Sequence, residues 1–416
     1  MAVAQPAALS TRAILLTVLV PFGVGYYFSY LYRTVNAVIS PELTREFALT
    51  AADLGLLTSA YFFAFAAVQI PLGRMLDRYG PRRVQAVMLS VAALGALLFA
   101  VGHSFTVVIL GRALIGVGVS ACLMAAVQAN ALWWPRERLP LVNGLITAFG
   151  GFGAISATAP VEALLQVTDW RHIFAGVALV TFCVAALIYF VVPERRAATG
   201  PQASPAEQKA MFRTVLRDGF FWRMTLMFTI LHGAFQSYQT LWAAPWLRDV
   251  AGLDRIGMAS VLSLVQVGFF IGALTSGFVA DRLRKTGIAT STLVASLIAV
   301  FFVVQAFVAA GIPETATVVW FCWGLFGSMQ LLSFSVFPQR YPQPIIGRVI
   351  TVVNLLVFVF AFAFQWGIGL IIDLWPPLPG GGFDPAAHRT AVLVLLAIEV
   401  AAWLGFVGPA LLRRGR

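Results

Sequence analysis

The chain carries the same short pattern twice, and each copy follows a long apolar run. The first copy reads Gly73-Arg-Met-Leu-Asp77-Arg78, and the second reads Gly277-Phe-Val-Ala-Asp281-Arg282. The two copies stand 204 residues apart in a chain of 416 residues. An internal repeat of fixed period constrains the whole fold, so the sequence predicts one membrane unit that is duplicated in tandem.

The composition places the chain in lipid. It is 60% hydrophobic and only 11% charged, which is too apolar for a soluble globule of this size. Apolar runs of about 20 residues, long enough to cross the membrane as a helix, recur twelve times, near 13–36, 55–73, 84–102, 106–132, 140–166, 172–192, 221–246, 257–279, 288–310, 315–337, 347–372 and 390–411. A membrane barrel would show short alternating segments instead, so we expect an all-α membrane protein.

The basic residues indicate the orientation of these spans. Of the 28 Lys and Arg, 21 fall on the side that holds both termini and the even-numbered connections. The others are Arg45, Arg171, Arg248, Arg255 and Arg389 on the opposite side, and Arg33 and Arg112 inside spans. Basic residues stay in the cytoplasm during insertion, so both termini are expected there. The net charge of +11 thus reflects topology, and no nucleic-acid partner is expected.

The longest connection divides the chain. We expect an N-terminal half at 1–192, a cytoplasmic linker rich in charge, Pro, Ser and Ala at 193–218, and a C-terminal half at 219–416. All three cysteines fall within spans and the four histidines are scattered, so neither a disulfide framework, a metal site nor a cofactor is predicted. The first span has no cleavage signal or organelle presequence before it, which favours a bacterial inner membrane.

The repeated pattern, G-x-x-x-D-R followed by further basic residues at the cytoplasmic end of a span, resembles the signature loop of the major facilitator superfamily. The resemblance covers both halves. It implies two six-helix bundles related by a pseudo-two-fold axis, which rock around a substrate site near the midplane. It also implies a monomer that acts as a transporter and not as an enzyme.

The signature loop has a physical interpretation as a conformational latch. Gly73 would let a neighbouring helix approach, and Asp77 could accept hydrogen bonds from the exposed N–H groups of a helix in the other half. Arg78 and Arg82 could then pair with acids and lipid head groups. The matching residues of the second copy are Gly277, Asp281 and Arg282. The alternative is that these charges only enforce topology.

Other segments narrow the branch of the family. The sequences Trp134-Pro-Arg136-Glu137-Arg138 and Asp169-Trp170-Arg171 look like loops of organic-anion porters. The run from Val107 to Gly116, with Arg112 inside it, looks like the helix-four motif of many exporters. Those exporters usually add a Gly-Pro-rich motif in helix five, but here Pro160 lacks the glycine pair that would follow. Proton-driven export is therefore not supported by that motif.

Arg33 is the most suggestive residue for substrate binding. It stands eight residues before Pro41 near the end of the first span, similar to the anion-binding arginine of organic-anion symporters and organophosphate antiporters. An arginine inside the membrane costs about 2.5–3.5 kcal/mol on insertion scales and points to function. The chain departs from the pattern of these families at two positions. Asn36 lies one residue later than the family asparagine, and Tyr32 replaces an aspartate of the symporters. The alternative is that Arg33 snorkels to the outer interface.

Two further spans offer polar faces toward a central site. In the seventh span, His232, Gln236 and Gln239 are spaced at i, i+4 and i+7 and would share one face. In the eleventh span, the residues expected to share a face are Asn354, Phe358 and Gln365. The antiporters use a second arginine in helix seven, where this chain has Ser237, which favours a monoanion or zwitterion. For each amide, interhelical packing is the alternative to substrate contact.

The ionisable residues inside spans leave the coupling open between proton symport, uniport or exchange, and export. His232 is the first candidate for proton coupling because its charge can change near neutral pH. Glu162 and Arg112 follow, whereas Glu399 lies in a peripheral helix and is assigned a structural role. No conventional nucleophile and base pair is visible.

The sequence thus predicts a secondary transporter for a small organic anion or amphipathic metabolite. Its partners would be the substrate, membrane lipid and, if transport is coupled, protons. An exporter of drugs or metabolites is the first alternative, and a membrane receptor that does not transport is the second.

Overall fold

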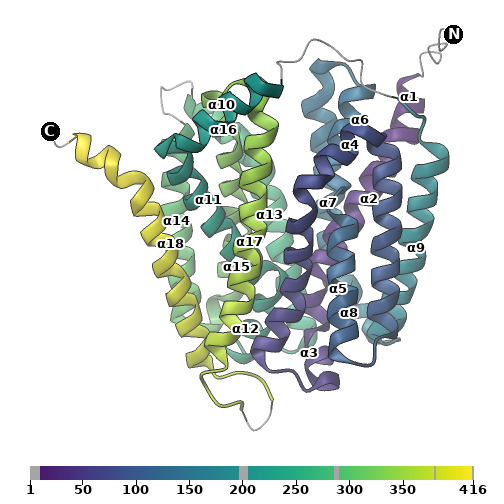
Figure 1. Ribbon diagram of the computed structural model, residues 1–416. Coiled ribbons are helices and arrows are strands. Elements are labelled where there is room, and N and C mark those ends of the chain that lie inside the picture. Colours follow the sequence, from purple (N-terminus) through teal and green to yellow (C-terminus); the bar gives the residue numbers. More distant parts are fainter. Residues whose placement is uncertain (1–9, 196–204, 285–289, 379–380, 415–416) are drawn as a thin grey trace.

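The computed structural model describes residues 10–195, 205–284, 290–378 and 381–414. Within these ranges the chain is helical and contains no strand (Figure 1). The helices of the first half are α1 Thr11–Ile14, η1 Leu15–Leu19, α2 Val20–Thr34, α3 Asn36–Phe47, α4 Ala51–Val101, α5 Phe105–Val119, α6 Cys122–Trp133, η2 Arg136–Arg138, α7 Leu139–Ser156, α8 Ala159–Leu165 and α9 Trp170–Val191. Those that follow are α10 Pro205–Arg217, α11 Gly219–Ser237, η3 Tyr238–Trp242, α12 Ala243–Asp249, α13 Arg255–Arg284, α14 Thr290–Ala310, η4 Pro313–Thr315, α15 Ala316–Met329, η5 Gln330–Leu332, α16 Ser333–Arg340, α17 Gln343–Ile372 and α18 Pro385–Arg414.

These helices form twelve membrane-spanning segments, which are called crossings below. Ten stretches of the described residues are long and apolar enough to span a bilayer. One of them, α4, has 51 residues and turns back at Gly80, where φ is 80° and glycine avoids the Cβ penalty. Pro81 then starts the second crossing. The remaining crossing is built from α11, η3 and α12 together, so the predicted all-α fold with twelve spans is confirmed.

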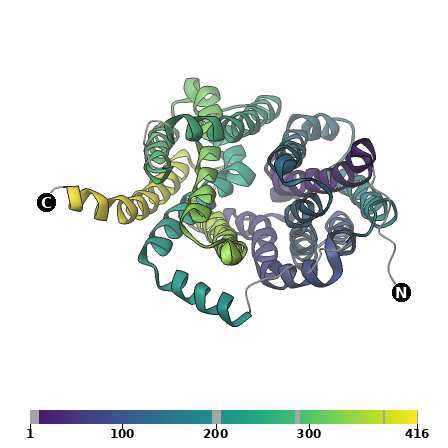
Figure 2. The same cartoon turned by 90° about the horizontal axis from the view of Figure 1, so that it is seen from above.

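The crossings form two bundles. Seen from above, α2 to α9 gather on one side and α11 to α18 on the other (Figure 2). Within the first bundle α4 packs on α5 and α9, and within the second α13 packs on α15 and α11 on α17. The predicted linker, 193–218, lies partly outside the described residues, and its second part forms α10.

Small residues let the helices of each bundle approach closely. A Cβ added at Gly118 of α5 would lie 2.2 Å from the backbone nitrogen of Ala92 in α4. One added at Gly324 of α15 would lie 2.0 Å from the carbonyl oxygen of Val265 in α13. Contacts of this kind are how membrane helices associate without a hydrophobic driving force.

The two ends of the molecule differ in how the bundles meet. The termini side holds α1, α10, α16 and the end of α18, and the far side holds α3, α8 and α12 (Figure 1). On the termini side, a Cβ added at Gly73, Gly144, Gly277 or Gly347 would meet no described atom within 4 Å. These glycines belong to α4, α7, α13 and α17, the helices through which the bundles face each other.

On the far side the same four helices are in contact. At Gly369 of α17 an added Cβ would lie 2.4 Å from the carbonyl oxygen of Ala51 in α4. The hydroxyl groups of Thr158, after α7, and Ser263, in α13, lie 2.8 Å apart. The structure is therefore closed between the bundles on the far side, while the four glycines of the termini side face open space.

Candidate functional site

A break in the first crossing positions Arg33. Pro41 has no N–H to donate to the carbonyl oxygen of Ala37, and the hydroxyl of Ser40 donates to that oxygen instead, at 3.0 Å. Val35 separates α2 from α3 just upstream. Arg33 thus lies in the last turn of α2 and points into the protein, with 7% of its surface exposed.

Aromatic rings surround the Arg33 guanidinium. Its central carbon lies 4.7 Å from the ring centre of Tyr30, 5.7 Å from that of Phe65 and 5.3 Å from that of Phe358. Cations are attracted to ring faces at such distances. Phe358 belongs to α17 of the second bundle, so the cage is closed by both halves. Snorkelling to the interface is not what the structure shows.

Arg33 has no carboxylate partner among the described residues, and its Nε has no hydrogen-bonding partner there. A buried cation without a counter-ion is costly, which favours a site for an anion. Arg112 differs, because it donates to the carbonyl oxygen of Tyr32 at 2.6 Å and lies over the ring of Tyr61. It ties α5 to α2 within one bundle.

Helix α11 brings His232 to the same region. His232 lies close enough to Arg33 for their charges to interact, and its ring stacks between Phe228 and Phe235. Its Nδ1 is buried and has no partner among the described residues. Gln236 is buried one turn further along, and no hydrogen bond joins its amide to a described residue.

Gln239 lies in the π-turn η3, which continues α11 toward Pro245. Gln239 donates to Gln266 of α13 at 2.9 Å inside the second bundle. Gln365 accepts from Thr240 at 3.2 Å. No hydrogen bond among the described residues joins either amide to Arg33, and their roles in substrate binding stay predictions.

The remaining predicted amides link α4 to its neighbours. Asn354 of α17 donates to Gln69 of α4 at 3.5 Å across the two bundles. Asn36 donates to the hydroxyl of Thr58 at 3.3 Å, within the first bundle. The Nε2 of Gln69 and the Oδ1 of Asn36 are buried without a partner among the described residues. These unsatisfied groups could bind polar groups of a substrate.

Glu162 is paired with a different arginine, Arg255. On the far side it accepts two hydrogen bonds from Arg255 of α13, at 2.9 Å from Nε and 3.1 Å from Nη2. Arg255 also binds Glu42 of α3 through Nη1. The two glutamates belong to the first bundle and the arginine to the second. The sequence placed Arg255 on the far side but did not indicate its partners.

The contact that Asp373 makes across the bundles was not predicted from the sequence either. Its two carboxylate oxygens accept from the N–H groups of Ala51 and Ala52 at 2.9 Å each. An anion is stabilised at such a helix N-terminus. The carboxylate ends α17 of one bundle and caps α4 of the other, which is the chemistry that the sequence predicted for Asp77 on the opposite side.

On the termini side, Asp77 and Arg78 are exposed, and Asp77 makes no hydrogen bond or ion pair with the described residues. The close helix approach expected at Gly73 is not seen in this conformation. Gly277 and Arg282 are likewise exposed, and the side chain of Asp281 lies outside the described part of the structure.

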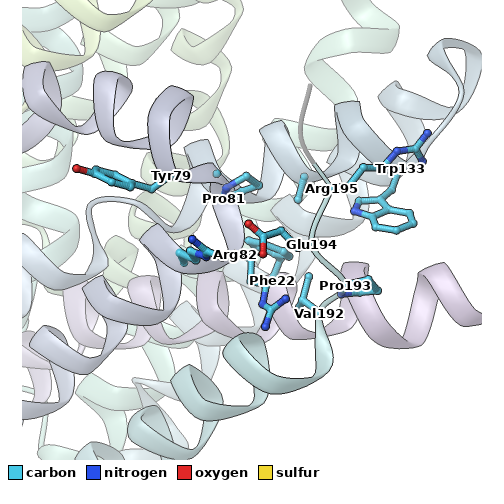
Figure 3. Close-up of a pocket in the computed structure, with 12 residues that line it drawn as sticks. Phe22, Tyr79, Pro81, Arg82, Trp133, Val192, Pro193, Glu194 and Arg195 are labelled. Atoms are coloured by element: carbon cyan, nitrogen blue, oxygen red, sulfur yellow. Dashed lines mark hydrogen bonds and ion pairs between the residues drawn. The ribbon is translucent and has the colours of Figure 1, made fainter. Parts of the chain in front are cut away.

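Arg82 packs within the first bundle. It donates to the carbonyl oxygen of Tyr189 at 2.8 Å and lies over that ring. Its neighbour Arg83 pairs with Glu194 at 2.8 Å. Figure 3 shows Arg82 and Glu194 lining one recess near Phe22, with Tyr79 pointing away from them. Lipid contact by these arginines stays a prediction.

Glu399 is buried in α18 and accepts a hydrogen bond from Gln305 of α14, so it joins two helices of one bundle. The described residues contain no group of three or more metal-ligating side chains.

Comparison with known proteins agrees with this architecture. The sequence model of the Major Facilitator Superfamily matches residues 22–365. A probable sulfoacetate transporter of Cupriavidus necator is 24% identical over 273 residues, which are 62% of this chain and 63% of that protein. A probable L-galactonate transporter of Escherichia coli is 24% identical over 280 residues, 63% of this chain and 60% of that protein. The chain thus spans less than two thirds of the curated relatives that it matches.

A bacterial homologue of the lysosomal transporter Spinster, solved in an inward-facing and unoccupied conformation, has the same fold. The TM-score is 0.71 at 17% identity, and the match covers 96% of each chain. The relatives are named as transporters and not as enzymes. The family match covers most of the sequence and the fold agrees throughout, so the chain belongs to the Major Facilitator Superfamily.

Proposed function

We propose that this chain is a secondary transporter that carries a small organic anion across a bacterial inner membrane by alternating access. The observation that carries the proposal is Arg33, a buried cation between the two bundles with no carboxylate partner among the described residues. An anionic substrate would supply the missing counter-charge. The aromatic cage would exclude water and accept an apolar substrate body.

The relatives support this substrate class, since two of them are named for sulfoacetate and L-galactonate. Both names describe organic anions. The distribution of Lys and Arg supports a cytoplasmic termini side. On this assignment the structure is an inward-facing form, closed toward the periplasm by the contacts of the far side.

The proposal is tested by comparing anions with their neutral analogues. Purified protein is heated with a panel of carboxylates and sulfonates, and with the matching amides. A ligand that binds only the folded state raises the melting temperature, so we expect some anions to stabilise the protein while their amides do not. Flux in vesicles of known orientation then separates uptake from export, and binding without flux would indicate a receptor. Equal stabilisation by anions and amides would contradict the proposed role of Arg33.

His232 is proposed to link anion binding to protonation. It shares the region of Arg33, and an anion bound there would favour a positive charge on the ring. Anion binding should therefore take up a proton, and affinity should fall as pH rises from 5 to 8. In His232→Gln we expect a flat pH profile and uptake that only equilibrates. The measurement is ligand affinity at several pH values, and an unchanged profile would place the proton elsewhere.

A further inference from the structure

The far-side ion group has more acid than base. Arg255 carries one positive charge, whereas Glu42 and Glu162 offer two negative charges within hydrogen-bonding distance of it. The glutamate side chains are only 14% and 7% exposed. The Oε2 atom of Glu42 is buried without a partner among the described residues. One excess negative charge is thus held where solvation is poor.

Opening of the far side would separate these charges unevenly. Glu42 and Glu162 both belong to the first bundle, in α3 and α8, so they stay neighbours when the bundles part. Arg255 leaves with α13 of the second bundle. Without the arginine, the two carboxylates lose the counter-charge that they share and repel each other.

We propose that Glu42, Glu162 and Arg255 form a proton-binding gate at the periplasmic face. The proposal rests on the alternating access proposed above. Protons from the periplasm bind the glutamates in the open form, and closure brings Arg255 back and expels the proton. Because proton binding and opening are linked, acid on the periplasmic side favours the outward-open form.

Other charged groups surround this gate, in a depression with a volume of about 620 Å³. Glu46 binds Arg171, and Arg45 is exposed. Asp169 accepts from the N–H of His172, which holds the pKa of Asp169 below its usual value. All of these residues belong to the first bundle, so opening does not separate them from one another.

The second bundle contributes a matching set near Arg255. Asp254 accepts from the N–H of Gly257 at 2.8 Å. Asp249 accepts hydrogen bonds from Arg248 and binds His388 at 3.1 Å. These contacts also lie within one bundle. Among the described residues, two ion pairs join charged side chains across the bundles. These are the pairs of Arg255 with Glu42 and with Glu162.

The gate can be tested without substrate, by measuring the distance between two spin labels on the far side. The labels are placed by Val167→Cys in the first bundle and Ile312→Cys in the second, at positions 81% and 40% exposed. Cys122, Cys183 and Cys322 are replaced first. In this background we expect one short distance at pH 8 and a longer second population at pH 5, with the open-to-closed ratio rising by about tenfold.

Three gate variants should change this response. In Arg255→Gln the longer population should be present at pH 8 and should not change at pH 5. The double variant Glu42→Gln with Glu162→Gln should behave in the same way, because Arg255 then has no anionic partner. Arg255→Lys keeps the charge but loses the two-pronged contact, so its populations should lie between those of Arg255→Gln and the unchanged gate.

The matched control is Arg171→Gln, which removes an arginine of the same face whose partner Glu46 lies in its own bundle. It should keep the distances and the pH response of the unchanged gate. The proposal is overturned if Arg255→Gln keeps the closed distance and the full pH response, because the response then comes from groups such as His172 or His388. It is also overturned if Arg171→Gln opens the far side as much as Arg255→Gln. Since no substrate is present, either result leaves the anion assignment standing.

Discussion

Arg33→Ala should abolish binding of the anion that we propose as substrate while leaving the protein folded. Two charge-assisted hydrogen bonds to a carboxylate contribute about 1.5–3 kcal/mol each, and each 1.4 kcal/mol is tenfold in Kd. We therefore expect Kd to rise by at least about 100-fold. Arg33→Lys keeps the charge but loses the planar fork, so its loss should be smaller, on the order of tenfold. Binding of a labelled anion to purified protein measures both.

The control for Arg33 is Arg389→Ala, which removes the same charge from an exposed position of the far side. It should bind like the unchanged protein. Melting temperatures distinguish loss of the site from loss of the fold, because removing an unpaired buried cation should not destabilise the bundle. If Arg33→Ala binds the anion with unchanged affinity, the substrate's charge is held elsewhere and the aromatic cage has another role.

The sequence predicted the architecture well because its signals are local. Span length follows from the thickness of the bilayer, and the bend at Gly80 and Pro81 could be expected from the two residue types alone. The burial of Arg33 was also predictable, since an arginine in an apolar run is conspicuous. Its aromatic cage was not, because Phe65 and Phe358 come from crossings that only the tertiary structure brings together.

Other features depended on geometry that a helical wheel does not contain. The spacing of His232, Gln236 and Gln239 predicts a shared face but not the partner of each side chain, and Gln239 donates to Gln266 of α13 inside the second bundle. The apolar environment made Glu162 look like a lone intramembrane acid. In the structure it is paired with Arg255 across the bundles, a contact whose partners lie 93 residues apart.

The two sides of the molecule place carboxylates in related positions. On the far side Asp373, at the end of α17, caps the first turn of α4. On the termini side Asp77 lies near the end of the first crossing of α4, and α17 begins there with Pro342 as N-cap and no side-chain hydrogen bond. The same pair of helices therefore has a closed carboxylate contact at one end and an acid and an uncapped N-terminus at the other.

This arrangement predicts that Asp77 caps α17 when the termini side closes. Asp77→Asn removes the anion that the N–H groups would stabilise, an interaction worth up to about 2 kcal/mol in partly buried geometry. The outward-facing form should lose up to about 25-fold in population, and transport should fall accordingly. Anion binding to the inward-facing form should persist, because Arg33 and its cage are untouched.

Asp373→Asn is the matched control for Asp77→Asn, because the same change at the other end of the same helix pair should act in the opposite direction. The labels at positions 167 and 312 should report a longer distance in Asp373→Asn, whereas Asp77→Asn should keep the short distance even at pH 5. Transport is measured in liposomes beside these distances. Full transport by Asp77→Asn would mean that the signature loop sets topology alone, since a contact needed to close the termini side cannot be lost without slowing the cycle.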